Sequence, residues 1–421
     1  MNNTEIVKRG LKKRYAREKR FRLYGRCAVL VGFIFLALLV VDITLKAMPA
    51  FGVTEIRLEI PLDRGSLDLP AEGAISEEML SAVNYGGLIK KSLREAFPEV
   101  SSRKEKKLLY GLISSGAEFT LADRLRAEPS LVGSQPLEIW LKADDDVDTF
   151  FKLGSQTSRI DERQIEMIAA LEQSERIRVA FNTTFFTASD SREPEQAGIR
   201  GAIVGSFWTL LVTLLVSLPV GVAAAIYLEE FAPQNRLTDF IEININNLAA
   251  VPSIVFGLLG LAVFINFFGM PRSAPLVGGL VLSLMTLPTI IIASRAALKS
   301  VPPSIKEAAL GIGASNMQVV FHHTLPLAMP GILTGSIIGM AQALGETAPL
   351  LMIGMVAFIV DVPGGIFDSA TVLPVQIYLW SDSPERAFTA LTAATILVLL
   401  AFLAVMNAIA IYLRKRFERR W

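Results

Sequence analysis

The sequence has little of what metal and redox chemistry require. Its 421 residues include one cysteine, Cys27, and two histidines, the adjacent His322 and His323. A single cysteine excludes an intrachain disulfide and a cysteine-based metal cluster. Neighbouring residues on a helix point in different directions, so the histidines are not expected to share a metal ion. These residue types therefore predict neither a metal site nor a cofactor.

Signatures of nucleotide and membrane enzymes are also missing. The chain has no G-x-x-x-x-G-K-[ST] phosphate loop, no H-E-x-x-H and no G-x-S-x-G. An aspartate run, residues 144–146 followed by Asp148, lacks the glycine and distal glutamate of an EF-hand loop. We interpret this run as the solvated start of a helix. The chain is predicted not to be an enzyme, and ATP hydrolysis is expected on a separate subunit.

What the sequence has in abundance is apolar residues. Hydrophobic residues make up 52% of the chain, and the mean hydropathy is +0.46. A bilayer core of about 30 Å needs about 20 apolar residues of helix. The chain offers six candidate spans of roughly that length or more, the fifth interrupted by Gly345, Glu346 and Pro349: residues 27–45, 203–228, 248–268, 276–297, 331–359 and 387–413.

Charge distribution predicts how these spans are oriented. Residues 1–26 carry ten Lys and Arg, and residues 414–421 carry five. Basic flanks remain on the cytoplasmic side, so both termini are expected there, in the inner membrane of a bacterium. The basic segment 1–26 and the first helix, 27–48, are too long for a typical signal peptide, which favours an uncleaved anchor.

The long segment 49–197 is then expected outside the cytoplasm. Residues 50–197 contain 18 Lys and Arg against 26 Asp and Glu. Apolar and polar residues alternate over 51–60, which is typical of a strand. Further strands are predicted at 136–141 and 177–186. Helices are predicted from Ser76 to Leu88, interrupted at Gly86 and Gly87, and over 161–173. The segment is predicted to be an α+β domain inserted before the remaining spans.

The loop after the fourth span carries the most specific motif. It has Glu307, Ala308 and Ala309, then Gly313, then Leu325 and Pro326. This spacing resembles the EAA loop of ABC importer permeases, except that His323 replaces the usual isoleucine. Gly313 permits a turn, and Pro326 cannot continue a helix interior. We expect two short helices, 305–310 and 316–323, in a loop of about 299–327 that contacts the ATPase.

A second motif, Ala343 to Pro349, reads ALGETAP. It resembles the signature of the PstA-type permease of phosphate ABC importers, as do residues 198–206 and 251–257. Where many members carry arginine, this chain has Gln342. Glu346 is the clearest intramembrane charge, and such charges are costly. Candidate pathway or gating residues are therefore Glu346, Gln342, Thr347 and Arg295, although interhelical hydrogen bonding explains Glu346 equally well and a snorkelling anchor explains Arg295.

The resemblance covers 198–421 and implies an all-α polytopic membrane protein with the type I ABC importer permease fold. It implies inward phosphate transport by alternating access. It also implies a second homologous permease, two copies of a cytoplasmic ATPase and an extracytoplasmic phosphate-binding protein as partners, with no nucleic acid. Another oxyanion, such as sulfate, molybdate or phosphonate, is the alternative substrate. A membrane sensor with an external ligand domain is the alternative function.

Overall fold

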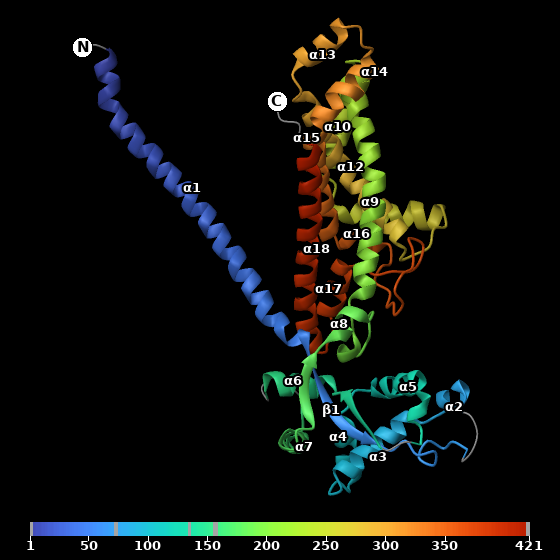
Figure 1. The fold of residues 1–421 in the computed structure, drawn as a ribbon. Helices are drawn as coiled ribbons and strands as arrows, with labels where there is room; N and C mark the ends of the chain where they lie inside the picture. The colour runs from blue at the N-terminus through green and yellow to red at the C-terminus, as the bar shows by residue number, and fades with distance from the viewer. Residues whose placement is uncertain (1–2, 71–74, 134–135, 155–158, 418–421) are drawn as a thin grey trace.

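The computed structural model describes residues 3–70, 75–133, 136–154, 159–417 of the chain. A column of long helices carries a small α+β unit at one end, and helix α1 (Asn3–Ala47) leans away from the column (Figure 1). The start of α1 and the end of helix α18 (Ala387–Phe417) lie at the other end of the molecule. The predicted cytoplasmic position of Trp421 lies outside the described residues.

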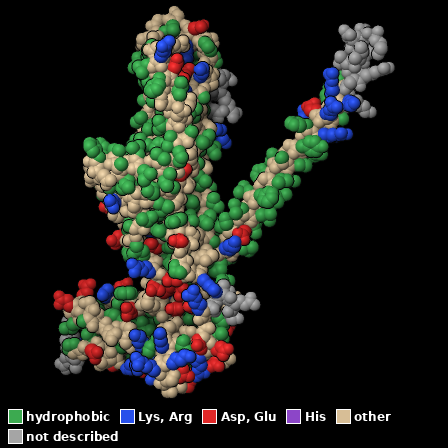
Figure 2. Space-filling model, turned by 180° about the vertical axis from the view of Figure 1, so that it is seen from behind, with side chains coloured by type: hydrophobic (Ala, Val, Ile, Leu, Met, Phe, Trp, Pro, Cys, Tyr) green, Lys and Arg blue, Asp and Glu red, His purple; other side chains and the backbone are tan. Residues whose placement is uncertain are grey.

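Apolar side chains cover the column, and charged side chains gather at its two ends (Figure 2). Five helices of the described part are long and apolar enough to cross a membrane: Lys13–Phe51, Arg200–Phe231, Pro275–Lys299, Asn316–Gly345 and Ala387–Arg416. The predicted third span has a different form. Helix α10 (Arg236–Leu248) and the helical stretch Ser253–Phe267 meet at an angle of 101°. Pro252, which caps the second stretch, explains the break because proline cannot donate a backbone hydrogen bond.

The centre of the column consists of helices α9 (Arg200–Ile226), α12 (Pro275–Lys299) and α15 (Leu325–Gly345). These helices approach closely at small residues. A Cβ atom at Gly279 would lie 2.5 Å from the Val212 Cβ, and one at Gly335 would lie 2.2 Å from the Ala293 Cβ. Helices in lipid associate through such close packing, since burial from lipid provides little hydrophobic drive.

The α+β unit is built around strand β1 (Gly52–Ile60), which follows α1 after one short helical turn. Strands β2 (Leu137–Lys142) and β3 (Ile177–Phe181) pair with β1 on either side, and both pairs are antiparallel. The inward residues of β1 are apolar and fully buried against helices α3 (Tyr85–Ala96) and α5 (Ala117–Ala127). The predicted α+β architecture is therefore observed.

Two boundaries within this unit differ from the sequence prediction. The strand predicted at 177–186 ends at Phe181, because Asn182 caps helix α8 (Thr183–Thr187) by accepting a hydrogen bond from the Phe185 amide at 3.2 Å. The first predicted helix is interrupted before its glycines. It divides into α2 (Glu77–Ser81) and α3, and the Asn84 side chain caps α3. Short polar side chains favour such caps over strand or helix continuation.

The remaining elements connect these parts. They are helices α4 (Arg103–Tyr110), α6 (Asp145–Leu153), α7 (Glu162–Gln173), α11 (Ser253–Gly260), α13 (Pro303–Gly311), α14 (Asn316–Gln318), α16 (Ala348–Met352) and α17 (Leu373–Ser381).

The sidedness predicted from charge can be tested by cysteine labelling. With Cys27→Ser as background, Ser130→Cys in the α+β unit and Ser304→Cys at the opposite end place one thiol at an exposed position each. We expect a membrane-impermeant maleimide to label Ser130→Cys in intact cells, and Ser304→Cys only after permeabilisation. The reverse pattern would overturn the assigned orientation.

Candidate functional site

Helix α13 contains the Glu-Ala-Ala motif and has well-defined ends. Pro302 precedes it and Pro303 occupies its first turn, where a missing amide proton costs nothing. At its end, the Ala314 amide bonds to the Ala309 carbonyl at 3.1 Å, and the Gly313 amide to the Leu310 carbonyl at 2.9 Å. This pair of bonds is a Schellman motif, and Gly313 has the positive φ of +90° that it requires.

The second half of the loop differs from the expected short helix. Ser315 and Gln318 form a capping box that starts α14. The chain then continues through a π-helical stretch, Val319–Thr324, directly into α15. The Leu325 amide bonds to the Val320 carbonyl five residues back, and Pro326, which has no amide proton to donate, follows at the start of the α-helical segment. The loop is therefore one short helix joined to the end of a 30-residue helix.

The loop exposes one face and anchors the other. Ala309 is 4% exposed and Ile305 is half-buried, whereas Glu307, Ala308 and Ile312 are exposed. An ion pair between Lys306 and Glu230, 2.6 Å apart, holds α13 against the end of α9. Leu325 and Pro326 are half-buried at the base of the loop. The exposed residues at the tip include large apolar side chains: Leu310, Ile312 and Met317. Such a surface is suited to binding another protein.

Arg295 lies near this end of α12 in an ion cluster. Its guanidinium is 2.6 Å from the Glu242 carboxylate and 3.4 Å from that of Glu229. These contacts join α12 to α10 and to the end of α9. Sequence reasoning singled out Arg295 but missed both glutamates, because the pairs join residues 53 and 66 positions apart.

The ALGETAP segment forms a break at the far end of α15. The helix ends at Gly345, Glu346 is extended, and α16 starts at Ala348. Helix α15 has 21 residues, which corresponds to about 30 Å between the loop and the break. The two motifs are thus at opposite ends of one helix. Pro349 is buried against Gly257 of α11, where a Cβ atom would lie 2.7 Å from the Pro349 Cα.

The polar residues at the break point away from the packed core. Gln342 is exposed, and Glu346 and Thr347 are half-buried. Within the described residues, the Glu346 carboxylate has neither a hydrogen bond nor an ion pair. The interhelical hydrogen bond that is the alternative explanation for Glu346 is therefore absent from the part of the chain that the structure describes. The role of Glu346 in the pathway or gate stays a prediction.

Comparison with known proteins identifies the family of this chain. The family model described as "Binding-protein-dependent transport system inner membrane component" matches residues 217–420. Phosphate transport system permease protein PstA 1 of Mycobacterium tuberculosis is 31% identical over 54% of this chain and 74% of its own length. This chain is a binding-protein-dependent ABC transporter permease.

Other permeases match shorter segments. Two probable ABC transporter permease proteins of Bacillus subtilis, YqgI and YqgH, are 38% and 35% identical over 40% and 43% of this chain. The matches span 56% and 60% of those proteins, which is less than two thirds of their length. Among solved structures, the inward-facing MetNI methionine ABC transporter has a TM-score of 0.40 at 17% identity, covering 53% of this chain and 95% of that one.

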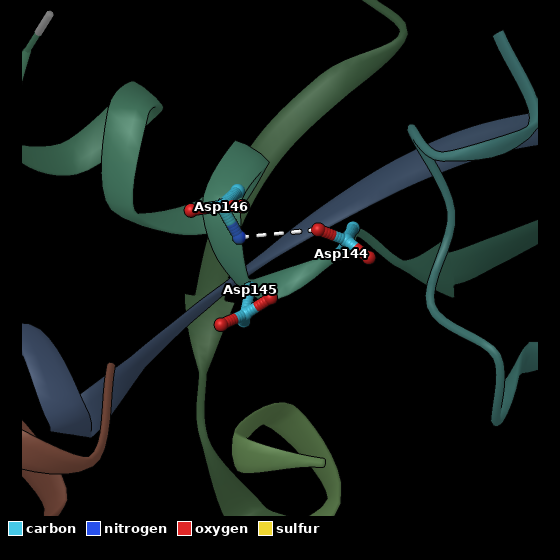
Figure 3. Close-up of side chains that lie close together, drawn as sticks. All are labelled: Asp144, Asp145 and Asp146. Carbon is cyan, nitrogen blue, oxygen red and sulfur yellow. Dashed lines mark hydrogen bonds between the residues drawn. The ribbon is translucent and has the colours of Figure 1, made fainter. Parts of the chain in front are cut away.

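The N-terminal part of the permease matches a different model, a domain of unknown function, over residues 8–162. This region contains the aspartate run. As expected, the run lies at the start of a helix: Asp144 caps α6 and accepts a hydrogen bond from the Asp146 amide at 3.2 Å (Figure 3). The three carboxylates are half-buried, however, because the unit meets the start of α18 at this point.

This crowding changes the acidity of the cluster. Burial, followed by the neighbouring charge of Asp145, raises the pKa of Asp144 to about 7. Burial and the charge of Asp146 raise the pKa of Asp145. Burial also raises the pKa of Glu195, although the Ser114 hydroxyl opposes the shift by donating a hydrogen bond to it. The cluster therefore favours protonation or a positive counter-ion.

Gly313 has a positive φ that glycine adopts without strain but alanine does not, and this difference can be tested. Gly313→Ala introduces a Cβ at a positive φ, which costs about 1–2 kcal/mol, or a factor of about 5–30 in the opening equilibrium. We expect amide hydrogen exchange at Ala314 to accelerate by that factor. Gly311→Ala is the matched control: it lies in α13, and its Cβ would contact nothing within 4 Å. Equal exchange in both variants would contradict the assigned turn.

The acidic cluster gives a pH prediction. The folded-state pKa of Asp144, about 7, lies above the ordinary value of 3.8, so the contribution of this group to stability is fully present below the ordinary value and is lost as pH rises through 7. The slope is at most one proton, about 1.4 kcal/mol per pH unit. We expect the melting temperature of the detergent-solubilised permease in chelator to fall between pH 5 and pH 8. Asp144→Asn should flatten this dependence, and an unchanged slope would exclude Asp144 as its source.

Proposed function

We propose that this permease moves inorganic phosphate inward across the cytoplasmic membrane by alternating access. The proposal is supported by the ALGETAP segment and by relatives whose names describe phosphate transport, including PstA of Mycobacterium leprae, 32% identical over 74% of its length. In this proposal a separate ATPase supplies the energy, a second homologous permease completes the pathway, and an external protein delivers phosphate.

Helix α15 carries the mechanical part of the proposal. It is one continuous helix, with Pro330 inside it, from the exposed loop to the break at Glu346. A displacement of the loop by the ATPase would therefore be transmitted along this helix to the polar residues at the break. The Lys306–Glu230 pair and the Arg295 cluster attach the same loop region to α9 and α10. Movement of the loop would thus displace several helices together.

The break is the proposed position of the pathway or gate. Glu346 and Gln342 are four positions apart at the end of α15, where Gln342 is exposed and Glu346 is half-buried. A second permease packed against this surface would enclose both side chains between the two subunits. Enclosure would strengthen the electrostatic interactions of the Glu346 carboxylate, because such interactions become stronger as water is excluded. Glu346 would then pair with a cation of the second subunit or respond to the passing anion.

The neutral Gln342 keeps a second substrate class open. An amide recognises an oxyanion by hydrogen bonding alone, without the charge of an arginine. Sulfate, molybdate and phosphonate share the oxygen acceptors that an amide would bind. Uptake of labelled phosphate into cells with and without the chain, together with its partner subunits, tests the assignment. We expect phosphate uptake that depends on the chain. An excess of sulfate, molybdate or phosphonate should not reduce it. Uptake of another oxyanion without phosphate uptake would reassign the substrate.

The charge of Glu346 can be tested in the same assay. Glu346→Gln preserves shape and removes only the charge. We expect this variant to reach the membrane in normal amount, to co-purify with its partners and to lose most uptake. Asp42→Asn is the matched control, since that carboxylate lies on α1, is exposed and pairs with Lys46 at 2.8 Å. Near-normal uptake by Glu346→Gln would show that the charge is dispensable for transport.

A further inference from the structure

The α+β unit exposes apolar side chains at the place where it joins the helical column. Strand β3 carries Ile177, Val179 and Phe181 on one face of the sheet, because alternate residues of a strand share a face. Ile177 belongs to the core of the unit and is 8% exposed. Val179 is 50% exposed and Phe181 is 64% exposed. The apolar face of β3 therefore continues beyond the core, and the described residues leave its end largely uncovered.

Two further phenylalanine rings extend this surface. Phe186 of α8 stacks on Phe181, with ring centres 6.1 Å apart and planes 10° apart, and Phe51 stacks on Phe186 at 6.2 Å and 14°. We call Phe51, Phe186 and Phe181 the aromatic row. Phe185 meets Phe186 edge to face at 4.9 Å and is buried in the cluster that joins the end of α1 to the start of α18. The junction therefore fixes the position of the aromatic row.

The aromatic row lies at the level where two helices of the column reach the membrane surface. Phe181 pairs with Gly52 in the sheet, and Gly52 follows α1 after a 3₁₀ turn of four residues, which is about 8 Å long. In Figure 1 the green arrow of β3 ends beside the end of α1. Helix α8 lies against the start of α9, because the Ile199 amide bonds to the Phe185 carbonyl at 2.9 Å. The ends of both α1 and α9 are thus adjacent to the row.

The apolar surface of α1 leads to the aromatic row. Leu45 and Met48, on the last turns before the row, are both exposed. Asp42 and Lys46 pair at 2.8 Å at the same level, as is typical where a span leaves the hydrocarbon. A bilayer with a core of about 30 Å has a total thickness of about 40–45 Å, which leaves an interfacial layer of about 5–8 Å on each side. Side chains one turn beyond the span are within reach of that layer.

We propose that the aromatic row and Val179 insert into the lipid interface on the side of the membrane that carries the α+β unit. The occupant of this surface is the bilayer itself, because the row continues the exposed apolar surface of a membrane-spanning helix at interfacial depth. Removal of these side chains from water drives the contact. The lipid contact would be an attachment of the unit in addition to its links to α1 and α9, and it would fix the tilt of the unit relative to the membrane.

Spin labelling of the full-length permease in lipid vesicles tests this contact. In a Cys27→Ser background, Phe181→Cys and Phe186→Cys each provide one site for a nitroxide label. The labelled permease is reconstituted in vesicles of phosphatidylcholine and phosphatidylglycerol. Collisions of the label with oxygen, which concentrates in lipid, are compared with collisions with a polar nickel complex, which stays in water. The ratio of the two collision rates reports whether lipid or water surrounds the label.

Two further positions calibrate this ratio. Leu36→Cys lies in the middle of the apolar part of α1 and is exposed, so it is the lipid reference. Arg178→Cys is the matched control on β3, since the Arg178 side chain leaves the opposite face of the strand and pairs there with Glu55 at 2.8 Å. We expect the ratio at Phe181→Cys and Phe186→Cys to exceed that at Arg178→Cys at least about threefold, because moving a polar complex into an apolar environment is costly.

Two outcomes would overturn the proposal. If both labels give the ratio of Arg178→Cys, the aromatic row faces water. If both labels collide rarely with oxygen and with the nickel complex, protein covers the row, either from this chain or from a second subunit. The two labels lie on different elements, so a substitution that disturbs one element leaves the other label to decide. The collision rates do not depend on which anion the permease transports.

Discussion

The close approach of α9, α12 and α15 is the constraint on which the rest of the structure depends. Lipid tails are as apolar as the helix surfaces, so the hydrophobic effect contributes little to helix association. The helices are held together instead by close packing of their backbones at small residues. Gly279 against Val212 and Gly335 against Ala293 leave no room for a side chain. Because α12 and α15 are fixed in this way, the loop that joins them is held in one place, and the exposed Glu-Ala-Ala helix projects from a rigid base.

The same packing allows irregular backbone where the permease needs it. Unpaired backbone groups are tolerated at membrane depth only where protein surrounds them or a cavity admits water. At the end of α15 the chain leaves the helix at Glu346, and α11 supports the following turn through Gly257. Helix α11, which follows the 101° bend after α10, contacts α16 directly after this break. Polar residues at the break are thus held by a well-packed support while remaining uncovered in this chain.

Charge is distributed to match this framework. At the loop end, Arg295 and Lys306 pair with glutamates from α10 and from the π-helical stretch Tyr227–Phe231 that follows α9, and these pairs join separate helices. At the other end, carboxylates from the α+β unit gather beside α18, and Lys152 pairs with Asp148 there. The unit is attached there by apolar packing as well, since Ala47, Phe185, Trp380 and Leu391 share one buried cluster. The junction therefore combines apolar packing with a group of half-buried carboxylates.

The sequence alone determined the family, the apolar helices and the inserted α+β unit, because span length, strand alternation and fixed motif spacing are local properties. It also located the break at Gly345 to Pro349. Only the tertiary structure showed that the helical stretch of the predicted third span meets α10 at 101°, that the loop's second helix continues into α15, and that the Glu346 carboxylate has no hydrogen bond or ion pair among the described residues. It likewise brought Glu229 and Glu242 to Arg295, and placed Asp145 and Glu195 on the lining of one cavity. These relations join residues dozens of positions apart, and sequence spacing carries no information about which distant side chains packing brings into contact.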